Sequence, residues 1–215
     1  MRSMSPPGKN NPMTHHPLTF LFTDLENSTH LWEQFPQVMR PALARHDALL
    51  RAAVEHHHGK IVKTTGDGLH AVFESPSDGV AAALAGQQTL IAEPWPTETS
   101  PLRVRMDLHT GESQEREGDY YGPALNRAAR IMSTGYGGQV LLSNVTAALV
   151  QDSLPTDTSL LDLGEHCRAT WPYRNISSNS TILPWPPTSL RSNPSPRSSI
   201  ISRSNSPALS GGSAN

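Results

Sequence analysis

The sequence of 215 residues lacks several features that define whole classes of protein. It contains a single cysteine, Cys167, which excludes an internal disulfide framework and indicates a reducing compartment. No run of about eighteen apolar residues occurs, and residues 1–17 lack the apolar core of a secretion signal. These absences predict a cytoplasmic protein with no membrane partner.

Acidic residues and lysine are missing from the last part of the chain. After His166 there is no Asp, Glu or Lys, and all five charged residues are arginine. The chain has 17 basic and 19 acidic residues, so residues 1–165 hold 12 bases against 19 acids. The near-neutral total of −2 creates no global field, and the arginine-containing end lacks regularly interleaved aromatic residues. We therefore expect no nucleic-acid partner.

Composition divides the chain into three parts. Residues 1–17 are rich in Pro, Asn, Ser and His and are expected to form a disordered leader. Residues 18–166 contain the periodic apolar patterns of a folded domain. Residues 167–215 are dominated by Ser, Pro, Asn and Arg, which predicts a disordered tail. The abrupt change near Cys167 suggests either a frameshift in the gene or a natural Arg/Ser-rich tail, and we expect the last strand of the sheet to be missing.

The folded region alternates between strand and helix patterns. Strands are predicted at 18–23, 61–65, 69–73, 102–109, 139–143 and 160–163, and helices from 29 onward and at 36–58, 78–92, 122–134 and 144–150. This order predicts an α+β fold with a ferredoxin-like βαββαβ core, a mostly antiparallel sheet, helices on one face and an αβ extension. In the strand 102–109, alternation places one set of residues inward and the other outward, the outward set being Arg103, Arg105, Asp107 and His109.

Two aspartates follow apolar strand patterns. Asp24 ends the run 18–23, and Asp67 lies in a Gly-Asp-Gly turn that predicts a β-hairpin, with positive φ values at Asp67 and Gly68. Turn chemistry alone would explain Asp67. If the two strands are neighbours, however, the two carboxylates lie side by side at one end of the sheet. Such a pair holds hard divalent cations for phosphate chemistry.

Other polar residues are spaced as if they address a ligand. Lys63 precedes Asp67 by four residues on one strand, a separation of about 13 Å that is too long for an ion pair. The two residues therefore do different jobs or serve different sites. Asn126 and Arg130 are four residues apart on the helix predicted at 122–134, so they share a face; a solvated polar face would explain them equally well. Arg127 lies off this face and has no assigned role.

Three segments, FTDLENST, KTTGDGLHAVF and GDYYGPALNRAARI, carry a resemblance in this order and spacing. They resemble the signature segments of the class III adenylate/guanylate cyclase catalytic domain, and the resemblance covers about residues 18–166. It implies the following roles: two divalent cations (Mg²⁺ or Mn²⁺) held by Asp24 and Asp67, adenine read by Lys63 and Asp119, and ribose and phosphate addressed by Asn126 and Arg130. It also implies a head-to-tail homodimer, in which the metal aspartates come from one subunit and the other four residues from its partner.

The resemblance therefore implies an enzyme with ATP as substrate that makes 3′,5′-cyclic AMP and pyrophosphate in intracellular signalling. A lysine donor and an aspartate acceptor match the edge of adenine, whereas guanine presents the opposite pattern. Two alternatives remain open: a guanylate cyclase, and a catalytically impaired cyclase-fold module that binds nucleotide or dimerises. A diguanylate cyclase is disfavoured because its Gly-Gly-acidic-acidic-Phe hairpin signature is absent.

Overall fold

The computed structural model describes residues 17–155, 158–166 and 178–183. Its helices are α1 (Ser28–Gln34), α2 (Pro36–His56), α3 (Pro76–Ala92), α4 (Pro123–Met132) and α5 (Asn144–Val150). Its strands are β1 (Leu18–Leu25), β2 (Lys60–Thr65), β3 (Gly68–Phe73), β4 (Val104–Gly111), β5 (Gln114–Arg116), β6 (Asp119–Tyr121), β7 (Val140–Ser143), β8 (Leu161–His166) and β9 (Ser178–Leu183). No helix in this described part is long and apolar enough to span a bilayer.

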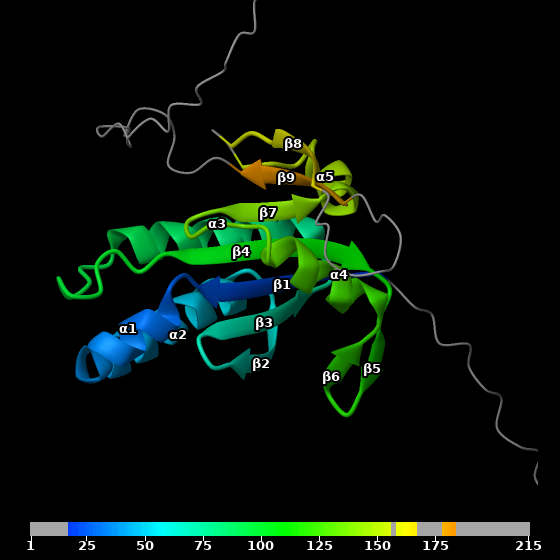
Figure 1. The fold of residues 1–215 in the computed structure, drawn as a ribbon. Coiled ribbons are helices and arrows are strands. Elements are labelled where there is room, and N and C mark those ends of the chain that lie inside the picture. Colours follow the sequence, from blue (N-terminus) through cyan, green and yellow to red (C-terminus); the bar gives the residue numbers. More distant parts are fainter. Residues whose placement is uncertain (1–16, 156–157, 167–177, 184–215) are drawn as a thin grey trace, which may run out of the picture. The chain divides into compact units, whose positions relative to one another are not determined.

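One sheet organises these elements, in the order β2-β3-β1-β4-β7-β9-β8 (Figure 1). β4 and β7 run parallel, and every other pair in the sheet is antiparallel. The predicted α+β fold with a mostly antiparallel sheet is therefore confirmed. β1 and β3 are antiparallel, so β1 ends beside the start of β3. The tight β2–β3 turn therefore lies at the same end of the sheet as the end of β1 (Figure 1).

Helices cover both faces of the sheet, which corrects the expectation of helices on one face. Leu21 of β1 packs into the larger apolar cluster with α2, α3 and α5. Phe20 and Phe22, which alternate with Leu21, form a second cluster with Ala124 and Ala128 of α4. Alternate residues of a strand point to opposite faces, so α4 lies on the face opposite to α2 and α3. Figure 1 shows α4 in front of β1 and β4.

The same arrangement corrects the outward assignment of two residues of β4. Asp107 and His109 were expected to face outward, yet they are 0% and 2% exposed. Their neighbours Met106 and Leu108 belong to the α2/α3 cluster, so Asp107 and His109 lie on the face that α4 covers. A sequence pattern of alternation shows that two faces differ, but it cannot show that a later helix buries the polar one.

The two turns around β2 use glycine differently from the prediction. Between Thr65 and Gly68 the residue with positive φ is Gly66 (67°), so the expectation of positive φ at Asp67 and Gly68 is wrong. A glycine at the first central position is the requirement of a type II′ hairpin turn. At the end of α2, His58 takes the left-handed conformation (60°), while Gly59 is needed because a Cβ there would lie 2.4 Å from the Phe73 ring.

Two other segments differ from the predicted elements. The polar stretch after β4 contains the short hairpin β5–β6, whose turn residues Glu117 and Gly118 both have positive φ. In the tail, residues 178–183 form β9, which pairs with β7 and β8 and takes the place of the strand expected to be missing. β9 covers an edge of β7 that would otherwise present unpaired peptide groups. The leader and the rest of the predicted disordered tail lie outside the described residues.

Candidate active site

Asp24 and Asp67 lie on chain segments that are in direct contact. The Oγ1 atom of Thr23, the residue before Asp24, accepts the backbone N–H of Leu69 at 2.9 Å. A Cβ on Gly68, the residue after Asp67, would lie 2.5 Å from the backbone oxygen of Thr23. Glycine at this position therefore allows the turn to approach β1 closely. The expectation that β1 and β3 are neighbours is confirmed by their antiparallel pairing.

The two carboxylates differ in their present partners. Arg105, the residue opposite Asp24 on β4, donates from Nε to Asp24 Oδ2 at 2.7 Å. Both side chains of this ion pair are partly exposed. Asp67 is half-buried and has no hydrogen bond or ion pair within the described part of the chain. Sequence reasoning missed Arg105 as a site residue, and its position opposite Asp24 emerges only from the strand register.

The donor set at this end of the sheet fits hard divalent cations. Within the ranges that the structure describes, no group of three or more His, Cys, Asp or Glu residues is placed to hold a metal ion. Two carboxylates, Asp24 and Asp67, lie on the touching segments at this end of the sheet, and carboxylate oxygens suit ions such as Mg²⁺ that keep water and phosphate oxygens as other ligands. Asp24 and Asp67 are the residues that could hold such ions.

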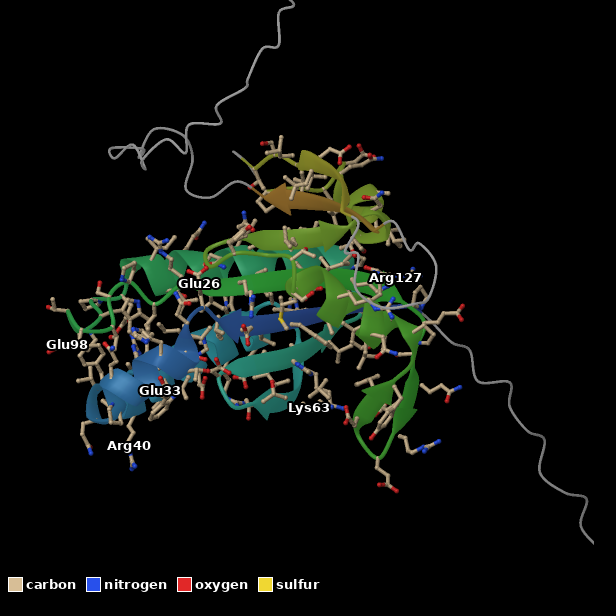
Figure 2. All side chains as sticks on the ribbon, viewed as in Figure 1. Glu26, Glu33, Arg40, Lys63, Glu98 and Arg127 are labelled. Carbon is tan, nitrogen blue, oxygen red and sulfur yellow. The ribbon has the colours of Figure 1, made fainter. Side chains whose placement is uncertain are left out.

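Lys63 and Asp119 meet although 56 residues separate them in the chain. Lys63 Nζ donates to Asp119 Oδ2 at 2.8 Å, and Asp119 Oδ1 accepts the backbone N–H of Tyr120 at 2.8 Å. The Lys63 hydrogen bond is the main cause that lowers the pKa of Asp119, followed by the Tyr120 N–H. The carboxylate is therefore ionised at neutral pH. Figure 2 shows Lys63 directed toward the β5–β6 hairpin, which carries Asp119.

His70 lies beside this pair and was not recognised from the sequence as a site residue. It is the cross-strand partner of Lys63, and its ring stacks on Phe22 with a centroid distance of 3.8 Å. Burial lowers the pKa of His70 first, and the nearby Lys63 charge lowers it further. The imidazole is therefore neutral at pH 7, and it adds a flat surface next to the Lys63–Asp119 pair.

Asn126 and Arg130 lie on the exposed side of α4. Ala124, Ala128 and Ile131 form the buried stripe of this helix, which leaves Asn126 and Arg130 in solvent. Neither side chain has a hydrogen-bond or ion-pair partner among the described residues. Both are thus available to an external ligand.

Several buried polar atoms on the sheet face that carries Phe22 have no partner among the described residues. Both carboxylate oxygens of Asp107 and the Nδ1 atoms of His70 and His109 have no hydrogen bond there. Burial raises the pKa of Asp107 well above its ordinary value. Burial, helped by the Arg127 charge, lowers the pKa of His109 to about 4. Desolvation therefore favours the uncharged forms of both Asp107 and His109.

The fold is that of a nucleotide-cyclase catalytic domain. The chain belongs to the adenylate and guanylate cyclase catalytic domain family, whose model matches residues 11–164.

Two relatives are similar to this chain over about 70% of its length. An uncharacterised protein of Mycobacterium tuberculosis (strain ATCC 25618 / H37Rv) is 42% identical over 151 residues, which are 69% of this chain and 50% of that protein. An adenylate cyclase of Podospora anserina is 34% identical over 182 residues, covering 71% of this chain and 8% of the enzyme. The chain thus spans half the length of the mycobacterial relative and a small part of the fungal one.

A solved structure shares the fold over most of the described region. An adenylate cyclase structure from Trypanosoma brucei, analysed in the monomeric state, superposes with a TM-score of 0.68 at 27% identity. The match covers 78% of this chain and 89% of the trypanosomal one.

Proposed function

We propose that this chain is an adenylate cyclase, which converts ATP into 3′,5′-cyclic AMP and pyrophosphate at the interface of a homodimer. The observation that carries the proposal is the 2.8 Å contact between Lys63 and Asp119, because it joins two of the three signature segments in one exposed pair. Membership of the cyclase family and the adenylate cyclase named among the relatives support the same chemistry.

Lys63 and Asp119 are suited to select adenine. The exocyclic amino group of adenine donates to a carboxylate, and a ring nitrogen accepts from an ammonium group. When adenine binds, the direct hydrogen bond between Lys63 and Asp119 would be replaced by two, one between the base and each of these side chains. Guanine presents the reverse pattern and would leave both residues mispaired, so ATP is favoured over GTP.

Asp24 and Asp67 would hold two Mg²⁺ or Mn²⁺ ions. Such ions, when bound, help to form the 3′-oxygen nucleophile and neutralise the leaving pyrophosphate. Asp67 is available for this role without any rearrangement of a described side chain. Asp24 must first give up the hydrogen bond from Arg105.

Asn126 and Arg130 would act on the reacting groups themselves. The Arg130 guanidinium would stabilise the charge that develops on the α-phosphoryl oxygens, and Asn126 would orient the ribose. Removal of one such preorganised group typically costs about 3 kcal/mol of transition-state stabilisation. Both side chains are exposed on α4, so a bound nucleotide could contact them.

The family resemblance implies a head-to-tail homodimer in which each site takes residues from both chains. In this arrangement Lys63 of β2 and Asp67 of the β2–β3 turn, although close in one chain's sequence, serve different nucleotides. Two chains arranged head to tail would complete two sites, and a monomer would have none. The trypanosomal neighbour is described as monomeric, so the oligomeric state requires its own measurement.

The test is product formation by the purified full chain with Mn²⁺ and either ATP or GTP. We expect cyclic AMP from a dimer, as judged by light scattering, and a rate reduced by about 10²-fold or more in Asp67→Ala. Asp152→Ala is the matched control, because Asp152 is exposed and has no partner among the described residues. It should retain the wild-type rate.

The other outcomes distinguish the alternatives. Preferential formation of cyclic GMP would identify a guanylate cyclase and contradict the assigned base selection. A folded dimer that makes neither product would be a nucleotide-binding or dimerisation module. An active monomer would contradict the shared site.

A further inference from the structure

Glu26 lies two residues beyond Asp24 and connects distant parts of the chain. Its Oε1 atom accepts the backbone N–H of Gly137 at 3.0 Å, across 111 residues of sequence. Its own backbone N–H donates to the Arg103 carbonyl at 2.8 Å. Figure 2 shows Glu26 far from Lys63, in the part of the molecule where β1 ends.

Gly137 is fitted closely against this carboxylate. A Cβ at Gly137 would lie 2.6 Å from Glu26 Oε2 and 2.5 Å from Arg103 Cβ, so any larger residue would displace the loop. The next residue, Gly138, has φ of 85° and donates its N–H to the Val104 carbonyl at 2.9 Å. The loop between α4 and β7 is thus seated on the end of β1 and the start of β4.

This loop continues directly from the helix that carries Arg130. The N–H groups of Thr134 and Gly135 bond back to the carbonyls of Ile131 and Met132, so the chain leaves α4 without a flexible spacer. Glu26 therefore links the segment of one proposed metal ligand to the helix of the proposed transition-state residues.

We propose that Glu26 is a positioning residue of the cyclase reaction, which holds the α4–β7 loop and thereby sets where α4 presents Arg130. The inference rests on the proposed function. Glu26 makes no contact with the reacting groups in this role; it acts as the acceptor for the Gly137 N–H. An error of about 1 Å in placing a catalytic group can cost about 10²-fold in rate.

The test compares Glu26→Ala with Glu26→Gln in the full chain, with Mn²⁺ and ATP. Glu26→Ala should lower kcat at least about tenfold and leave KM within about twofold, because the base-reading pair is distant. Glu26→Gln keeps an acceptor oxygen and should restore kcat to within about twofold. Glu33→Ala, which alters an exposed glutamate of α1 that has no partner among the described residues, should match wild type.

Hydrogen exchange at the Gly137 amide provides a readout independent of turnover. Protection should be lost in Glu26→Ala and kept in Glu26→Gln. If Glu26→Ala fails to fold, Gly137→Ala disturbs the same contact from the loop and should reproduce the loss of kcat. Wild-type kcat in Glu26→Ala, or equal losses in the Ala and Gln variants, would overturn the positioning role alone. A wild-type chain that cyclises neither ATP nor GTP would instead overturn the proposed function and the positioning role with it.

Discussion

The two faces of the central sheet bury different chemistry. Under α2, α3 and α5 lies a large cluster of apolar side chains. The buried Gln87 there donates to the Val104 carbonyl at 2.7 Å, whereas Nε2 of the buried His46 has no partner among the described residues. Under and beside α4 the apolar cluster is small, and Asp107 and His109 are buried without partners among the described residues. Of the six candidate site residues, two lie on α4 and the others at the end of β1, on β2, in the β2–β3 turn and at the start of β6. The first face mainly provides stability, whereas the second buries the polar side chains of Asp107 and His109 at a cost in stability next to the proposed site.

The comparison predicts that a change on the first face affects stability alone. Leu108 is fully buried in the α2/α3 cluster, so Leu108→Ala should lower the free energy of unfolding by about 4 kcal/mol through lost burial and a cavity. Urea denaturation measures this loss. At a temperature where the variant stays folded, its kcat should equal that of wild type, and a large drop in kcat would mean that the faces are not separable.

A change on the exposed side of α4 should have the reverse effect. Arg130→Ala should reduce kcat by about 10²-fold, which corresponds to about 3 kcal/mol of transition-state stabilisation, with no change in the urea midpoint. Arg127→Ala is the control, because Arg127 is an exposed arginine of the same helix with no assigned catalytic role. Equal losses in the two variants would indicate a general effect of charge rather than a specific role.

The buried acid should make stability depend on pH. Burial raises the pKa of Asp107, so the folded state retains the proton that the unfolded state releases above about pH 4. Between the unfolded-state and folded-state pKa values, Asp107 ionises only in the unfolded chain. This ionisation lowers the free energy of unfolding by up to about 1.4 kcal/mol for each pH unit. Asp107→Asn does not titrate, so its stability relative to wild type should rise from pH 5 to pH 8 in urea denaturation. A constant difference across this range would contradict the buried, protonated state of Asp107.

Parts of the site could be predicted because local patterns carried them. The apolar strand before Asp24 and the glycine-flanked turn at Asp67 can each be recognised from a few adjacent residues. Their proximity could be predicted by assuming that β1 and β3 pair. The resemblance of three segments added Lys63 and Asp119, and the structure brings this pair together. The β5–β6 hairpin could not be predicted from its three-residue polar strands, which bury few side chains.

The sequence by itself determined the class of fold and the residue types of the candidate site, because apolar periodicity and turn residues act over a few positions. Only the tertiary structure decided that Arg105 bonds Asp24, that Glu26 holds Gly137 and that α4 buries Asp107. Each of these contacts joins residues far apart in the chain. Their partners depend on strand register and on which face a helix covers, and no local pattern encodes either.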